Sequence, residues 1–320
     1  MPNERAIPLI ITCDVEPDAR QITGHETDWP GFVRQVDFVR SVRPKLEDLT
    51  GAPVRFTWML RLDHQIAEGF GSPAWVLEKH ADKFEALLAS GDELGLHVHT
   101  WRRARRFFRQ VWMADYENDD WCRSCIELAH DTYFKHFGER PTSISMGDNF
   151  MSAAAMTTIE RLGLTSDSSL SPGIPPRKAV VRGEKTRGTL PDARRTPTHP
   201  FRPSRADFTV PGEPSYAVWE IPVSSGVVKK NRDGTDRIRK LLLGGNPDHV
   251  RTIVNANLDA GVTALVADSR TDALMGPKTG PRFRDFFDNL PSYTNGRAVR
   301  FSTRREVCDR LDSSQPAGGP

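Results

Sequence analysis

The segment Glu93-Leu-Gly-Leu-His-Val-His-Thr-Trp101 is the most informative stretch of this 320-residue chain. Its apolar residues predict a buried strand that ends in two imidazoles, His97 and His99. Because side chains alternate between the two faces of a strand, residues i and i+2 project from the same side. His97 and His99 can therefore converge on one metal ion.

A second strand-like run, Pro8-Leu-Ile-Ile-Thr-Cys-Asp-Val-Glu16, lies near the N-terminus and ends in two carboxylates at the same spacing. Asp14 and Glu16 therefore share one face of their strand as well. Two apolar strands that each end in a same-face pair of metal-capable groups predict a cation site. The alternative is an exposed strand end for the two acids and hydrogen-bonded core side chains for the two histidines.

Strand-like and helix-like segments alternate over most of the chain. The predicted strands cover residues 8–16, 53–60, 93–100, 143–148, 165–170, 216–224, 262–269 and 298–302. The predicted helices cover residues 30–50, 73–90, 117–138, 151–162, 247–260 and 281–290. This alternation predicts an α/β fold, a parallel (β/α) barrel of seven or eight strands.

In such barrels the chemistry lies at the carboxyl ends of the strands. The polar groups that fall at those ends are Asp14, Glu16, His97, His99, Asp148 and the run Asp268-Ser-Arg270. The strands were assigned from apolar patterning alone, so this agreement supports the barrel independently.

The composition favours a soluble enzyme without a nucleic-acid or membrane partner. Hydrophobic residues make up 38% and charged residues 27% of the chain, and the formal net charge of +2 is too small to favour nucleic acid. There is no apolar run near 18 residues and no leader-like N-terminus, so a cytoplasmic location is expected.

The basic cluster Arg102–Arg106 is interpreted as a solvated helix start or a receptor for an anionic group. Cys122 and Cys125 lie in a predicted helix without a second pair, which argues against a zinc or redox role.

The chain is expected to form one domain over residues 1–311. Residues 171–214 are rich in proline and arginine and lack periodicity, which predicts a long loop insert over the active face. From Asp312 the sequence is of low complexity and is expected to be disordered through residue 320.

Imidazole and carboxylate ligands suit a divalent metal. Zinc is the default for two histidines and one carboxylate, while Co, Ni, Mn and Fe fit the same ligand types. Such a metal lowers the pKa of its bound water to about 7 and so supplies a nucleophile. Of Asp14 and Glu16, one can be the ligand and the other the base.

The motif Thr12-Cys-Asp14-Val-Glu16-Pro-Asp18 resembles the first motif of the polysaccharide deacetylases, also called the NodB-homology or carbohydrate esterase 4 group. The stretch Gly91–His97 resembles the strand that leads to the metal histidines of that family. Weaker similarities lie at residues 141–147, 162–170, 220–223 and 300–307, so the resemblance covers roughly residues 6–308.

The resemblance implies a distorted, often incomplete (β/α) barrel with Asp14 as general base and with Glu16 and His97 as metal ligands. The usual H-x-x-x-H spacing of the family would place the next ligand at Trp101, which cannot bind metal. His99 is therefore the expected substitute.

Two positions depart from the pattern of the family and mark the chain as a divergent member. Ser145 stands where an arginine orients the base, and Arg270 stands where a histidine protonates the leaving amine. A side chain with a pKa above 12 cannot be the acid near pH 7, so Arg270 is expected to stabilise an oxyanion or hold an anionic group. His64, just past the second strand and next to Asp63, is the first candidate for the replacement acid, and His199 in the long loop is another.

Four further residues are predicted to contact the substrate: Trp58, Arg61, Trp101 and Asp148. The two tryptophans are candidate sugar-stacking platforms, with a place in the barrel core as their alternative. Asp148 could also be an additional ligand or acid.

These residues predict a metal-dependent hydrolase that removes an acyl group, most simply N-acetyl, from a sugar or glycan precursor, with Asp14 as base and a metal-bound water as nucleophile. One alternative is a metal-dependent hydrolase of an anionic non-sugar amide or ester, and another is an amidohydrolase-like barrel. A third is a non-catalytic member that binds a glycan or a partner. The expected ligand is a small molecule or glycan, and the sequence leaves the oligomeric state open.

Overall fold

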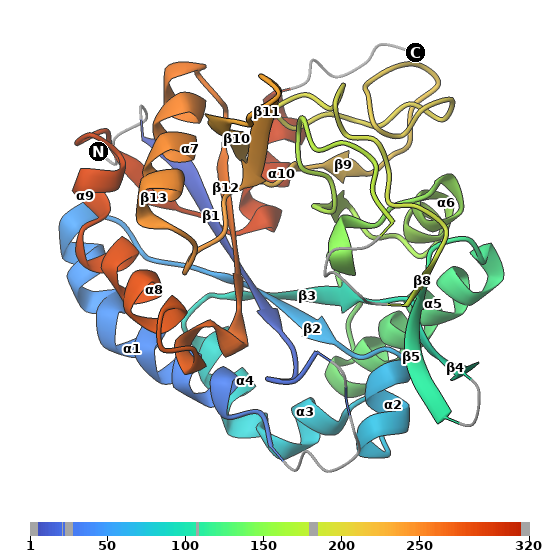
Figure 1. The fold of residues 1–320 in the computed structure, drawn as a ribbon. Helices are drawn as coiled ribbons and strands as arrows, with labels where there is room; N and C mark the ends of the chain where they lie inside the picture. Colours follow the sequence, from blue (N-terminus) through green and yellow to red (C-terminus); the bar gives the residue numbers. More distant parts are fainter. Residues whose placement is uncertain (1–5, 21, 23–27, 107–108, 179–184, 315–320) are drawn as a thin grey trace.

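The computed structural model describes residues 6–20, 22, 28–106, 109–178 and 185–314. Its centre is a curled sheet of eight parallel strands (Figure 1). The sheet runs in the order β12 (Leu265–Arg270), β1 (Ile7–Val15), β2 (Thr57–Arg61), β3 (Glu93–Val98), β6 (Ser143–Met146), β7 (Ser166–Asp167) and β9 (Trp219–Glu220), and β13 (Val299–Phe301) also pairs with β1.

Helices surround the curled sheet (Figure 1). They are α1 (Pro30–Thr50), α2 (His64–Phe70), α3 (Trp75–Lys79), α4 (Ala81–Ala89), α5 (Asp119–Phe137), α6 (Ala153–Arg161), α7 (Pro247–Asp259), α8 (Thr279–Asp288), α9 (Leu290–Tyr293) and α10 (Arg304–Ser314), with short 3-10 turns η1 (Gly147–Asn149) and η2 (Thr271–Met275). On α1 the buried residues Phe32, Val36 and Val39 follow the helical spacing that turns one face to the sheet.

The predicted distorted (β/α) barrel is confirmed, and its two edges are bridged by irregular backbone. Ser224 donates from its backbone N–H to the carbonyl of Val266 on β12 at 3.0 Å. Leu241 in turn donates to the carbonyl of Ser224 at 2.6 Å, and Leu243 to that of Asp268 at 2.8 Å. The carboxyl ends of all the main strands therefore face one end of the barrel.

The predicted helix over residues 73–90 is wrong as a single element, because the chain turns at His80 between α3 and α4. The residue has φ −126° and ψ 36°, outside the helical region. Its buried ring contacts Phe32 and Trp75, and its Nε2 atom lies 3.1 Å from a carboxylate oxygen of Asp28. These tertiary contacts hold the His80 ring in the core, and the helix is interrupted at this residue as a result.

The basic cluster at residues 102–106 is not a helix start. It belongs to β4 (Trp101–Arg106), which pairs antiparallel with β5 (Arg109–Asp115). The Arg102 Nε atom donates to Asp115 at 2.7 Å, which engages one guanidinium of the cluster within the hairpin.

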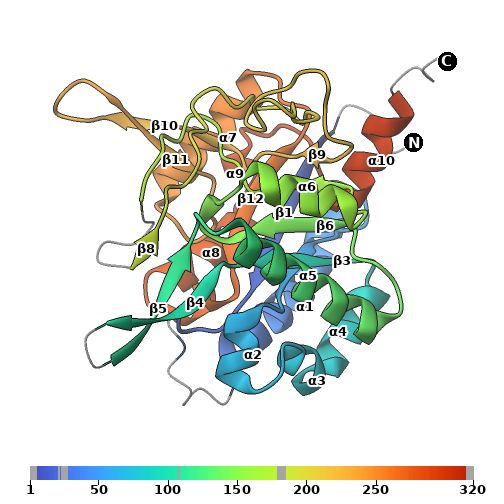
Figure 2. The ribbon, with the colours of Figure 1, turned by 90° about the vertical axis from the view of Figure 1, so that its right-hand side faces the viewer.

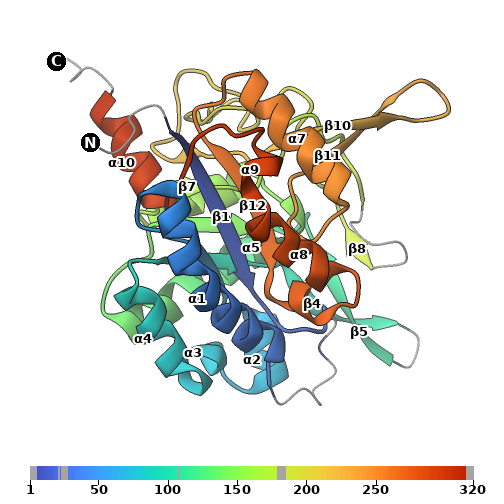
Figure 3. The same cartoon turned by 90° about the vertical axis from the view of Figure 1, so that its left-hand side faces the viewer.

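A second hairpin that the sequence reading missed is formed by β10 (Ser225–Lys230) and β11 (Asp236–Lys240). Its turn contains Asp233-Gly234, and Gly234 has φ 82°, a left-handed conformation that glycine adopts without steric cost. Figures 2 and 3 show this hairpin projecting from the body of the molecule.

The predicted loop insert at 171–214 is mostly irregular but is tied down by backbone hydrogen bonds, and its residues 179–184 lie outside the described part. Its short strand β8 (Thr186–Arg187) pairs with β5, and Phe201 forms an isolated bridge with Glu220. The predicted disordered tail is corrected at its start, because α10 continues to Ser314. Asp312 accepts hydrogen bonds from Trp219 Nε1 at 2.9 Å and from Arg202 at 2.8 Å, which fixes this turn; residues 315–320 lie outside the described part.

The four cysteines are buried free thiols, and Cys122 and Cys125 lie on α5. Burial raises the pKa of Cys122 to about 12, so its thiol stays protonated near neutral pH. No helix of the described chain is both long enough and apolar enough to cross a lipid bilayer.

Two carboxyl groups lie side by side in the sheet, where Glu220 on β9 is in register with Asp167 on β7. Both are fully buried. Asp167 accepts from the Ser169 hydroxyl at 2.6 Å, and Glu220 accepts from the Leu170 N–H at 3.1 Å. Burial and the neighbouring Asp167 charge raise the pKa of Glu220 well above its ordinary value.

We expect Glu220→Gln to be more stable than the unmodified protein at alkaline pH. A raised folded-state pKa stabilises the fold fully below the unfolded pKa of about 4.3, and this contribution is lost as pH rises toward the folded pKa. The free energy of unfolding falls by at most about 1.4 kcal/mol per pH unit in this range. Glutamine does not ionise, so the variant lacks this pH-dependent loss. Urea unfolding at pH 5.5, 7.0 and 8.5 measures the difference. Glu85→Gln, on the exposed face of α4, is the control, and equal pH slopes for all three proteins would contradict the raised pKa of Glu220.

Candidate metal centre

A cavity of about 490 Å³ opens at the carboxyl ends of β1, β3, β6 and β12, beneath the β10–β11 hairpin. Its charged and imidazole-bearing residues are Asp14, Glu16, Arg20, His97, His99, Asp148, Arg177, Arg239, Lys240, Asp268 and Arg270. The structure thus brings together the strand-end pairs that the sequence analysis singled out.

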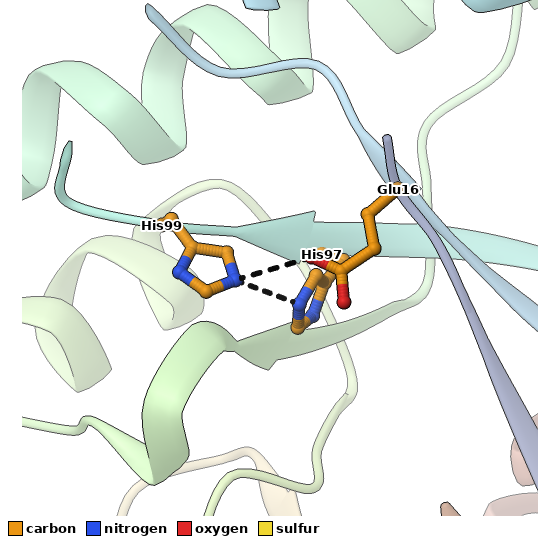
Figure 4. Close-up of side chains that lie close together, drawn as sticks. All are labelled: Glu16, His97 and His99. Carbon is orange, nitrogen blue, oxygen red and sulfur yellow. Dashed lines mark hydrogen bonds and ion pairs between the residues drawn. The ribbon is translucent and has the colours of Figure 1, made fainter. Parts of the chain in front are cut away.

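Three of these side chains converge at the centre of the cavity (Figure 4). The Nε2 atoms of His97 and His99 lie 3.1 Å apart, and His99 Nε2 lies 3.8 Å from Glu16 Oε2. One donor atom of each residue falls within 4.8 Å of the others, and all three residues are buried. Glu16, His97 and His99 are therefore a candidate set of metal ligands.

The donor set fits a divalent cation. Tetrahedral ligands at about 2.05 Å from zinc lie about 3.3 Å from one another, which falls between the 3.1 and 3.8 Å observed here. Burial and the neighbouring His99 lower the pKa of His97, and burial and Arg61 lower the pKa of His99. Both imidazoles are therefore neutral near pH 7 and offer lone pairs.

Glu16 is held in place by two guanidinium groups. Arg270 Nη1 lies 3.1 Å from Glu16 Oε1, and Arg61 Nη1 lies 3.4 Å from Oε2. Although burial raises it, the charges of Arg270 and Arg61 lower the pKa of Glu16 overall. The residue therefore remains a carboxylate. Arg61 is itself fixed by Asp63 at 2.6 Å and Gln65 at 2.7 Å.

The His99 ring packs directly against Gly147, and its Nδ1 atom lies close to two polar side chains. A Cβ atom at Gly147 would lie 2.3 Å from Cε1 and Nε2 of the His99 ring. The Nδ1 atom lies 2.8 Å from the donor Trp101 Nε1 and 3.5 Å from an oxygen of Asp148. In this structure Nδ1 accepts the Trp101 N–H; if Nε2 held a cation, Nδ1 would instead have to carry a proton, and Asp148 would be the available acceptor, as is common around metal-bound histidines.

Asp14 lies beside the candidate ligands and is itself outside the three-residue set. Its Oδ1 atom is 3.6 Å from His97 Nδ1, which also lies 3.1 Å from the Ser145 hydroxyl. Burial and the charges of Asp268 and Glu16 raise the pKa of Asp14 well above its ordinary value. Ser145, at the position of an expected arginine, thus contacts the histidine ring and adds no positive charge.

Several predicted site residues have other surroundings. Trp58 is fully buried, packs edge-on against Phe32 and donates to Asp92 at 3.0 Å, so it presents no face to a substrate. Trp101 is 1% exposed and contacts His99. Arg61 contacts Glu16 and does not line the cavity.

His64, the expected replacement acid, does not line the cavity either. Its ring stacks on Trp121 with centroids 4.5 Å apart, and its Nε2 atom lies 2.8 Å from the Ser124 hydroxyl. His64 is the first residue of α2, directly after the N-cap Asp63. From this position its side chain packs against α5. The structure therefore gives His64 no access to the side chains around Glu16.

The sequence analysis missed Lys240, which enters the cavity from β11. Its Nζ atom lies 2.7 Å from Asp268 Oδ2. Although burial lowers it, the charges of Asp268 and Asp14 raise the pKa of Lys240, so it remains an ammonium. The Asp233-Gly234 turn flanked by strand-like residues was the available signal for this hairpin.

The curled parallel sheet with its site at the strand ends is the architecture of polysaccharide deacetylases, and the resemblance predicted from the sequence is confirmed at the level of the fold. No protein-family model and no curated protein sequence matches the chain. Among solved structures, a proposed polysaccharide deacetylase from Mycobacterium smegmatis is similar over 100% of this chain and 96% of its own, with 14% identity and a TM-score of 0.51.

Two further structures have lower TM-scores. A pseudoenzyme of carbohydrate esterase family 4 from Bacillus anthracis is 7% identical over 97% of this chain and 67% of its own, with a TM-score of 0.44. A peptidoglycan N-acetylglucosamine deacetylase is 12% identical over 95% of this chain and 89% of its own, also with a TM-score of 0.44.

We expect Gly147→Ala to weaken cation binding by at least about tenfold, because the added methyl group must displace the His99 ring and overpacking of this kind costs about 1–3 kcal/mol. Calorimetric titration of the metal-free protein with Zn²⁺ or Co²⁺ measures the affinity. Gly226→Ala on β10 is the matched control, since its Cβ would meet Ile253 at an ordinary 3.5 Å. Equal affinities for Gly147→Ala and the unmodified protein would argue against His99 as a ligand.

Proposed function

We propose that this chain is a divalent-metal-dependent hydrolase that removes an acyl group, most simply N-acetyl, from a sugar or glycan precursor. The observation that carries the proposal is the meeting of Asp14, Glu16, His97 and His99 in one cavity at the strand ends. The likeness to the proposed polysaccharide deacetylase from Mycobacterium smegmatis supports the same reaction class.

Glu16, His97 and His99 would hold the cation, with zinc as the default and Co, Ni, Mn and Fe as alternatives. When bound, such a cation supplies Lewis acidity that lowers the pKa of water and polarises an acyl carbonyl. Arg61 and Arg270 keep Glu16 ionised and fixed in position, so neither is free to act as a proton donor.

Asp14 is the residue that we assign to proton transfer. Its carboxylate accepts a proton from the attacking water as the new C–O bond forms. The C–N bond then breaks, and the leaving nitrogen needs a proton. Lys240 and Arg270 retain their protons because their carboxylate partners raise their pKa values. Asp14 therefore returns the proton that it accepted, and a separate histidine acid is not required.

We expect Asp14→Asn to lose about 10²–10⁴ of the turnover rate and to keep its metal, because an amide cannot accept the proton but Asp14 is outside the ligand set. Glu16→Gln should lose both turnover and metal. Acetate release from N-acetylglucosamine and its oligomers, together with elemental analysis, measures the two properties. Asp37→Asn, on the exposed side of α1, is the control with the same chemical change.

Removal of the metal with a chelator should abolish acetate release, and added Zn²⁺ or Co²⁺ should restore it. If the metal-loaded unmodified protein releases no acyl group from any acylated sugar, the hydrolase proposal fails. A glycan-binding member of the same fold would then be the better description.

A further inference from the structure

Most cations of the cavity already have a carboxylate partner. Lys240 pairs with Asp268 at 2.7 Å, and Arg270 pairs with Glu16 at 3.1 Å. Arg20 pairs with Asp148. These pairs neutralise one another inside the cavity and leave no charge for a substrate to balance.

Arg177 and Arg239 differ from these residues. Both line the cavity, and neither forms an ion pair with a carboxylate of the described chain. The Arg177 Nη2 atom is 3.5 Å from Asn149 Oδ1, and the Arg239 Nη1 atom donates to the Ile238 carbonyl at 3.1 Å. Each guanidinium therefore contacts only neutral oxygens and has unused donors.

The two arginines come from segments that pack on each other. Arg177 is bridged to Leu190, whose N–H donates to the Arg177 carbonyl at 2.8 Å. Ile238, next to Arg239 on β11, approaches Gly173 so closely that a Cβ there would lie 2.8 Å from its Cδ1 atom. The two segments are therefore packed together, and the charge of Arg177 acts on Arg239.

The partner of Arg177 is also fixed. The Asn149 amide nitrogen donates to the Ser169 carbonyl at 3.1 Å and to the Ser171 hydroxyl at 3.0 Å. These bonds orient the amide so that its oxygen faces Arg177. A positioned guanidinium loses less side-chain entropy when it binds a ligand.

The proximity of the two charges has an energetic cost. Burial lowers the pKa of Arg177, although Asp148 and Tyr116 raise it in part, and burial together with the charges of Arg237 and Arg177 lowers the pKa of Arg239. Both groups stay protonated at all ordinary pH values. An anion between them would offset this repulsion and use their free donors in charge-assisted hydrogen bonds.

We infer that Arg177 and Arg239 form a subsite for an anionic group, a phosphate or a carboxylate, carried by the acylated substrate. The inference rests on the proposed function for the acyl half of the substrate and deepens it. Asp14 and the candidate ligands lie on the floor of the cavity at the strand ends, whereas Arg239 is exposed on the hairpin. The substrate is therefore an acylated acid, with its neutral acyl group on the metal side and its charge under the hairpin.

Binding is tested by calorimetry on metal-loaded Asp14→Asn protein, which should not consume the probes. The probes are N-acetylglucosamine 6-phosphate, N-acetylmuramic acid and neutral N-acetylglucosamine. We expect one or both acids to bind at least about tenfold more tightly than the neutral sugar, with an affinity that falls as salt rises. The preferred acid identifies the group as phosphate or carboxylate.

In the Asp14→Asn protein, a further Arg177→Gln or Arg239→Gln substitution should reduce the affinity for the preferred acid about tenfold or more. The affinity for the neutral sugar should not change. Arg177→Lys and Arg239→Lys should retain part of the preference. Arg232→Gln, at the exposed hairpin turn, removes the same charge outside the cavity and should have no effect. Thermal unfolding of each variant confirms that the fold is kept.

The absence of any preference for the acids, or a preference that survives loss of both arginines, would overturn the inference. Acetate release from neutral sugars, together with no preference for the acids, would leave the hydrolase proposal standing without the subsite. Arginine-dependent binding of an acid without any turnover would support the subsite and contradict the hydrolase. The two proposals can therefore fail separately.

Discussion

The burial of the Glu16 carboxylate is the constraint on which the site depends. An ionised carboxylate without partners is too costly to keep inside a protein, and it would take up a proton instead. Arg61 and Arg270 prevent this, because each lies within 3.4 Å of a different Glu16 oxygen. Since Asp63 and Gln65 hold Arg61 in turn, the negative charge that a cation would need at the candidate site is already built into the fold.

The parallel sheet makes this concentration of charge possible. All its main strands end at one side of the barrel, so short side chains from β1, β3 and β12 meet without long loops. Register adds precision, because Arg61 on β2 lies next to His97 on β3 and Asp14 on β1 lies next to Arg270 on β12. A shift of one residue in either pair would turn these side chains to the opposite face.

Much of the fold and the centre of the site could be predicted from local pattern. Alternation along two strands was sufficient for Asp14, Glu16, His97 and His99, since the faces of a strand follow from spacing alone. The same rule argues against Trp58 and Arg61 sharing a face, because they are three residues apart on β2. His64 and Lys240 could not be placed in this way. Their positions depend on how the chain turns after a strand, and such turns are decided by long-range contacts such as that between His64 and Trp121.

If the two proposals hold, the β10–β11 hairpin separates recognition of the substrate from the reaction at the strand ends. Its base is joined to β12 through backbone bonds of Leu241 and Leu243, while its turn at residues 231–235 is exposed. Changes in hairpin length or sequence would therefore alter what sits over the cavity while the floor of the barrel keeps its geometry. Exchange of this hairpin between related chains would therefore change the wall of the cavity without rebuilding the strands that carry Glu16, His97 and His99.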